Sequence, residues 1–88
     1  MDMAPSTPES LTPHVAATTL AFFGFAGGYE PSKWRSALLT AISISDPENL
    51  AKFEAGFPGE VAAVKLISHT RGRAILRVIA TRTGTGQS

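Results

Sequence analysis

Cysteine is absent from these 88 residues, which excludes disulfide bonds and thiolate ligands for a metal. Small secreted domains usually depend on such cross-links, so we expect a cytoplasmic protein. Histidine is scarce as well. His14 and His69 lie far apart, and neither has Asp or Glu at a spacing typical of metal ligands. The sequence therefore predicts no metal site and no cofactor.

Catalytic motifs are also missing. No serine lies in the context of a nucleophile elbow, and the glycine-containing segment 24–28 lacks the strand, helix and lysine of a phosphate-binding loop. Glu48, Glu54 and Glu60 fall on the outer faces of predicted helices, where carboxylates are usually solvated. We therefore expect a protein that is not an enzyme.

Acidic residues are missing from the C-terminal third. Residues 1–60 hold all seven carboxylates and three bases, for a net charge of −4. Residues 61–88 hold five bases and no carboxylate, for a net charge of +5. The total of +1 therefore conceals a charge dipole along the chain.

Formal charges are absent from residues 11–29, whose central part, residues 15–26, is strongly apolar. A membrane span needs about twenty predominantly apolar residues, and this stretch is interrupted by polar residues and by Gly27-Gly28. We predict a buried core helix of about twelve residues. The alternatives are an amphipathic or membrane-inserting segment, and a strand.

Three phenylalanines of this segment suggest self-association. Phe22, Phe23 and Phe25 point in different directions on a helix, and a core of this size can hardly bury all three rings. We therefore predict a homodimer with these phenylalanines at the interface.

Helix signals are clearest near residue 46. Asp46 can accept a hydrogen bond from a free N–H of the first turn, and Pro47 suits the first helical position because it has no N–H to leave unpaired. A capping box formed by Ser45 and Glu48 is the alternative start. The next boundary lies around Phe57.

Two residues mark that second boundary. Gly56 can adopt the left-handed conformation that ends a helix, and Pro58 can begin the next one. This pattern predicts a sharp turn with Phe57 as its pivot, followed by a helix from Pro58 to about Ser68. Upstream, the apolar stripe that begins at Trp34 predicts a helix over about 31–45, with Pro31 at its first position.

The segment 73–82 is compatible with two structures. Its branched residues suit a strand, but neither face of such a strand would be purely polar. Helical spacing gathers Ala74, Ile75, Val78 and Ile79 on one face and leaves Arg73 and Arg77 outside. We favour the helix, with the stretch 71–73 as a turn before it.

Together these signals predict an all-α fold, a small bundle of four to five short helices. A single helical domain spans residues 13–82, between a flexible proline-rich arm (1–12) and a flexible tail (83–88). The predicted core consists of Trp34, Leu38, Ile42, Leu50, Phe53, Phe57, Val61 and Val64.

Basic residues form the one distinctive functional pattern. If the chain stays helical through Gly72, then Lys65, His69, Arg73 and Arg77 recur every four residues and form a single stripe. Such a stripe suits an acidic protein groove or phosphates, and the alternative is a solvated helix face. The predicted binding residues are Lys65, His69, Arg71, Arg73, Arg77 and Arg82.

Two short motifs carry a resemblance to a known group. Asp46-Pro47-Glu48-Asn49 and Phe57-Pro58-Gly59-Glu60-Val61-Ala62-Ala63 resemble a pattern in short helical proteins of actinobacteria and their phages. The resemblance covers residues 41–67. It implies a small cytoplasmic phage or prophage accessory protein and brings no activity with it.

The sequence thus predicts a non-enzymatic binding protein, such as a phage factor that engages or inhibits a host protein through an acidic surface of that partner. A nucleic-acid-binding protein that uses the basic C-terminal helix is the first alternative. A membrane-active protein that acts through residues 15–26 is the second, and the interrupted apolar run argues against a membrane partner.

Overall fold

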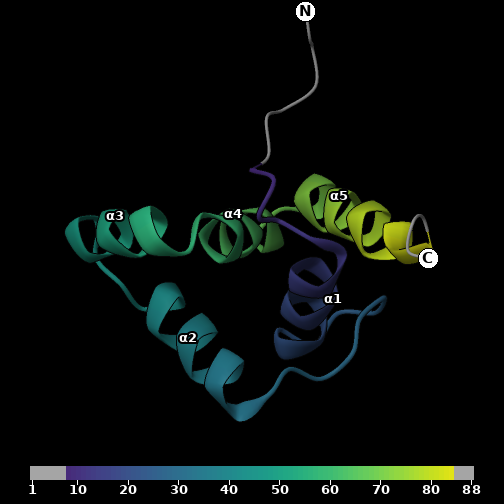
Figure 1. The fold of residues 1–88 in the computed structure, drawn as a ribbon, viewed down its shortest axis with the longest axis horizontal. Helices are drawn as coiled ribbons and strands as arrows, with labels where there is room; N and C mark the ends of the chain where they lie inside the picture. The colour runs from purple at the N-terminus through teal and green to yellow at the C-terminus, as the bar shows by residue number, and fades with distance from the viewer. Residues whose placement is uncertain (1–7, 85–88) are drawn as a thin grey trace, which may run out of the picture.

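The computed structural model describes residues 8–84, and within them the chain forms five α-helices, a short 3₁₀ helix and no strand (Figure 1). This confirms the predicted all-α bundle. The predictions for residues 1–7 and 85–88 lie outside the described part. The elements are α1 (Pro13–Phe22), α2 (Lys33–Ser43), α3 (Pro47–Gly56), α4 (Pro58–Ile67), α5 (Thr70–Ala80) and η1 (Thr81–Gly84).

Polar side chains cap the first three helices. Asp46 accepts a hydrogen bond from the Asn49 N–H (2.9 Å), as predicted. Ser32 does the same for α2, which therefore starts at Lys33 and leaves Pro31 outside the helix, contrary to prediction. Ser45 caps nothing, because its hydroxyl donates to the Ala41 carbonyl at the end of α2 (2.7 Å).

The junction of α3 and α4 lies at Phe57, the predicted pivot. Gly56, however, does not adopt the predicted left-handed conformation; it is the last residue of α3. Hydrogen bonding continues one residue further, since the Phe57 N–H donates to the Phe53 carbonyl (2.6 Å). Phe57 leaves the helical region with φ −135° because it precedes Pro58, whose ring disfavours an α conformation there.

Helix α1 packs against α4 and α5 and fills what we call the main core. All residues from Val15 to Leu20 are buried, which confirms the predicted core helix, although α1 ends already at Phe22. The buried hydroxyls of Thr18 and Thr19 donate to carbonyls of the preceding turn. The main core consists of Leu11, Val15, Ala16, Ala17, Leu20, Ala63, Ile67, Leu76, Ile79 and Ala80.

Helix α5 confirms the helical interpretation of residues 73–82, but only Ile79 and, in part, Ile75 of its predicted apolar face are buried. Gly72, Leu76, Ile79 and Ala80 face the core, whereas Val78 is 57% exposed. Gly72 lies inside α5 and not in a turn. A side chain at this position would overlap the Leu66 carbonyl, so the glycine lets α5 pack directly on the end of α4.

The second, smaller cluster joins α2, α3 and α4 and contains most of the predicted core. Leu38, Ile42 and Val61 are buried, with Leu50, Phe53, Phe57 and Val64 half-buried around them. Trp34 is an error of prediction. It is 60% exposed, with the Phe57 ring (ring centroids 5.9 Å apart) and the Arg35 guanidinium beside it.

Candidate binding surfaces

The continuous basic stripe, which required a helix unbroken from Lys65 through Gly72, does not form. Helix α4 ends at Ile67, and His69 adopts an extended conformation (φ −123°, ψ 142°) before α5 begins. The Ser68 hydroxyl bonds the Lys65 carbonyl and stabilises this break. Lys65 therefore lies on one helix and the arginines on another, and the exposed Lys65 ammonium pairs with Glu54 of α3 (3.5 Å).

Two of the predicted binding arginines hold the fold together. Arg73 donates to the Ile67 carbonyl (2.9 Å) and to the Thr70 hydroxyl (3.1 Å), and its guanidinium lies 4.5 Å from the centre of the Phe25 ring. Arg77 donates to the Ala26 carbonyl (3.1 Å). Together they fasten the loop after α1 onto α5.

The remaining predicted binding residues face solvent. His69, Arg71 and Arg82 are exposed, and Arg71 makes no ion pair or hydrogen bond within the described residues. Neither α1 nor α5 contains a carboxylate, whereas Glu48 and Glu54 lie on α3. Because α3 and α5 lie at opposite ends of the molecule (Figure 1), the charge asymmetry of the sequence becomes an asymmetry in space.

The three phenylalanines predicted at a dimer interface are half-buried in the monomer. Phe22 and Phe23 pack edge to face with ring centroids 4.9 Å apart, and Phe23 and Phe25 pack against the main core. The monomer thus covers more of these rings than the sequence suggested.

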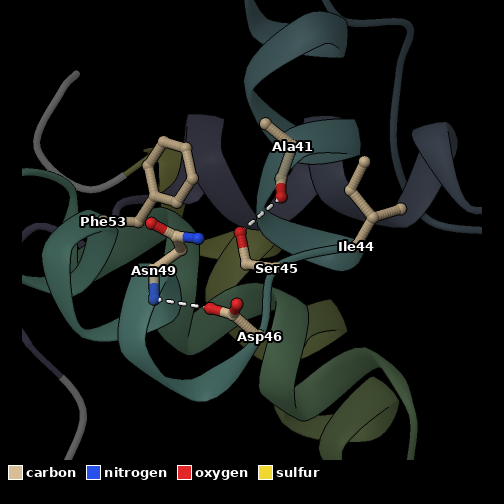
Figure 2. Close-up of a pocket in the computed structure, with 6 residues that line it drawn as sticks. All are labelled: Ala41, Ile44, Ser45, Asp46, Asn49 and Phe53. Carbon is tan, nitrogen blue, oxygen red and sulfur yellow. Dashed lines mark hydrogen bonds between the residues drawn. The ribbon is translucent and has the colours of Figure 1, made fainter.

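An open pocket of about 470 Å³ lies between the end of α2 and the start of α3. Sequence reasoning missed it, because its lining comes from two helices and from the link between them. Figure 2 shows its polar side, where the Ser45 hydroxyl donates to the Ala41 carbonyl and the Asp46 carboxylate accepts from the Asn49 N–H. The pocket is lined by Ala41, Ile44, Ser45, Asp46, Asn49 and Phe53.

The exposed edge of α2 is the strongest apolar surface feature. Trp34, in the first turn of α2, is 60% exposed, and Ile44, the residue directly after the helix, is 78% exposed. A hydrophobic stripe predicted for the core is thus partly available to solvent. Large exposed apolar side chains that lie together mark interaction sites more often than single ones do.

No three His, Cys, Asp or Glu side chains within residues 8–84 are grouped as a metal site would require. His14 bonds the Tyr29 hydroxyl (2.9 Å) at the surface, and His69 lies on another element. Among the same residues, no helix is both long and apolar enough to cross a bilayer.

Comparisons with known proteins give no information about function. No protein-family model, no curated protein and no solved structure matches this chain. The resemblance of residues 41–67 to actinobacterial and phage proteins stays a prediction.

Proposed function

We propose that this chain is a non-catalytic protein-binding domain, and that its α5 end contacts an acidic surface of a protein partner. The separation of charge carries the proposal. Helix α5 contains Arg71, Arg73 and Arg77 and packs on the uncharged α1, so no carboxylate of either helix neutralises this end. Complementary charge accelerates association and selects partners.

A protein partner is favoured over nucleic acid because few of the bases are uncommitted. Binding to a duplex backbone draws on many cations at once. Here Arg73 and Arg77 bond carbonyls of their own chain, and Lys65 pairs with Glu54. The Phe25 ring lies against Arg73 and is half-buried, so it is not an open platform for base stacking.

We further propose that the partner is a host protein and that the chain acts in the cytoplasm. The resemblance of residues 41–67 to phage proteins supports the first statement, and the absence of cysteine supports the second. A membrane role through residues 15–26 has less support, because Val15 to Leu20 are buried in the main core.

Arg71→Glu gives the direct test. Arg71 is exposed, so the substitution should leave the fold intact while it reverses one charge of the basic end. Proteins captured from a cell lysate by the immobilised chain should be lost with this variant. They should be retained with Lys52→Glu, a matched change of an exposed base on α3.

Titration with duplex DNA at several salt concentrations separates the alternatives. The proposal predicts no appreciable binding at physiological salt. Tight binding whose logarithm falls with log salt at a slope of about −0.9 per phosphate contact, and which Arg71→Glu flattens, would replace the protein partner by nucleic acid.

A further inference from the structure

One side of α2 carries an apolar stripe that the described residues leave open. It consists of Trp34, Ala37, Ala41 and Ile44, of which Ala41 is half-buried and the other three are exposed. At 100° per residue these four positions fall within about 80° of the helix circumference. The side that faces the rest of the fold carries Leu38, Leu39 and Ile42, and Trp34 lies at its edge. Helix α2 lies at an edge of the molecule (Figure 1).

The α2 stripe has the same pattern of side-chain size in both directions. Large residues stand at its ends and alanines at its centre, with spacings of three, four and three. If two copies of α2 lie side by side in opposite directions, Trp34 comes to lie against the partner's Ile44, and Ala37 against the partner's Ala41. Small central side chains allow close approach of two helices, and antiparallel helices also bring opposite ends of their dipoles together.

The pocket at the end of α2 offers a place for the tryptophan. Ile44 and Ala41 belong both to the stripe and to the pocket lining, with Phe53 beside them (Figure 2). A Trp34 ring that lies against the partner's Ile44 therefore reaches the mouth of the partner's pocket. The polar side of the pocket also suits indole, whose N–H needs an acceptor when it is buried, and Asp46 supplies carboxylate oxygens there.

Charges at the two ends of the α2 stripe are complementary. Lys33 precedes Trp34, and Asp46 lines the pocket beyond Ile44, and both side chains are exposed. The antiparallel arrangement brings each Lys33 near the partner's Asp46, so the two-fold symmetry creates the opposite-charge contact twice. Such contacts fix register and orientation more than they add affinity.

We propose that two copies of this chain associate through antiparallel α2 helices, with each Trp34 seated in the partner's pocket. This interface is proposed in place of the one predicted at Phe22, Phe23 and Phe25. A contact of two short helices belongs to the small class of interfaces, so the dimer should form in the micromolar range. It leaves α5 uncovered and does not depend on the proposed function.

The only tryptophan of the chain makes the test specific. Sedimentation of the full chain across the micromolar range should show conversion from monomer to dimer. Over the same range the Trp34 emission should move to shorter wavelength, because the indole leaves water for the pocket. The monomer–dimer curves from sedimentation and from Trp34 emission should have their midpoints at the same protein concentration.

Ile44→Asp should raise the dissociation constant at least about tenfold, because it puts a carboxylate in place of the apolar side chain against which the partner's Trp34 ring lies. Ile44 is exposed in the monomer, so helix content and thermal unfolding should be unchanged at low concentration. Val78→Asp is the matched control on α5, at another exposed apolar residue, and should leave the dimer intact.

Three outcomes would overturn the proposal. One is a monomer throughout the concentration range. The second is a dimer whose formation leaves the Trp34 emission unchanged. The third is a dimer that survives Ile44→Asp, which would return the interface to Phe22, Phe23 and Phe25.

Discussion

Gly72 illustrates how one residue sets the distance between two helices. Because an added Cβ would overlap the Leu66 carbonyl, Gly72→Ala should push α5 away from α4 and lower the free energy of unfolding by about 1–3 kcal/mol. Urea denaturation at equilibrium measures this loss.

Gly56→Ala provides the control on the same scale. Gly56 ends α3 with helical geometry and has nothing within 4 Å of the position of a Cβ. Alanine should be neutral there or stabilising by up to about 1 kcal/mol, since it restricts the unfolded chain. Similar losses in the two variants would show that Gly72 has no special packing role.

Trp34 marks a limit of prediction for single residues. Helical periodicity correctly grouped it with Leu38 and Ile42, but periodicity defines an arc of the helix and not what covers the arc. Leu38 and Ile42 meet Val61 of α4, whereas Trp34 lies at the edge of the arc, beside Phe57. The sequence alone does not show how much of this arc α4 covers.

Helix α2 is linked to α4 by an ion pair. Arg35 of α2 bonds Glu60 in the first turn of α4 (2.6 Å), and these side chains are only 18% and 12% exposed. Arg35→Ala leaves the Glu60 carboxylate without its partner in a largely dry site. We expect a loss of about 2–3 kcal/mol, measured by thermal denaturation.

The exposed pair of Lys65 and Glu54 serves for comparison. Both side chains are about half exposed, so Glu54→Ala should cost less than about 1 kcal/mol. If the two variants lose equal stability, burial is not what makes the Arg35 pair important.

The loop between α1 and α2 should depend on α5. Replacing Arg73 and Arg77 by alanine removes the hydrogen bond to Ala26 and the cation–π contact with Phe25. The loop should then open more often, and chymotrypsin should cut it faster at Phe25 and Tyr29. Mass spectrometry of the fragments measures this, with Arg71→Ala as the control.

This test can contradict the structural role of the two arginines. If the double variant and Arg71→Ala are cleaved at the same rate, the contacts contribute nothing to the order of the loop. Faster cleavage at every site of the chain would instead indicate general unfolding, which circular dichroism distinguishes.

Helix starts were predictable because their signals are local. Asp46 caps α3, and Pro47 directly after it is the first residue of the helix. The end of α4 near Ser68 was predicted as well, but the turn after it was expected at residues 71–73. The break lies at Ser68 and His69 instead. It exists because α5 packs back on the end of α4 through Gly72, a residue that hydrophobic periodicity does not count.

At the scale of the molecule, the smaller cluster was anticipated and the main core was not. The helices of the smaller cluster are consecutive, and the sequence pattern connects them directly. The main core pairs α1 with α5, which are separated by residues 23–69. Each segment was predicted to be helical, but the choice of partner depends on long-range packing.

The contributions of the two clusters to the free energy of unfolding can be compared by mutation. Leu20 is fully buried in the main core, so Leu20→Ala should cost about 2–5 kcal/mol. Phe57 is only half-buried, so Phe57→Ala should cost less than the full amount for a core phenylalanine, and less than Leu20→Ala. If denaturant titrations showed a larger loss of stability for Phe57→Ala than for Leu20→Ala, the smaller cluster around Phe57 would contribute more to stability than the main core.

The pairing of α1 with α5 also has a consequence for biosynthesis. Chains leave the ribosome from the N-terminus, so α1 emerges before α5 has been made. Its buried residues, Val15 to Leu20, are covered only in part by α4 until residues 70–80 follow. The smaller cluster, in contrast, has all its helices once α4 has emerged. During translation α1 is therefore the segment that a ribosome-associated chaperone would encounter.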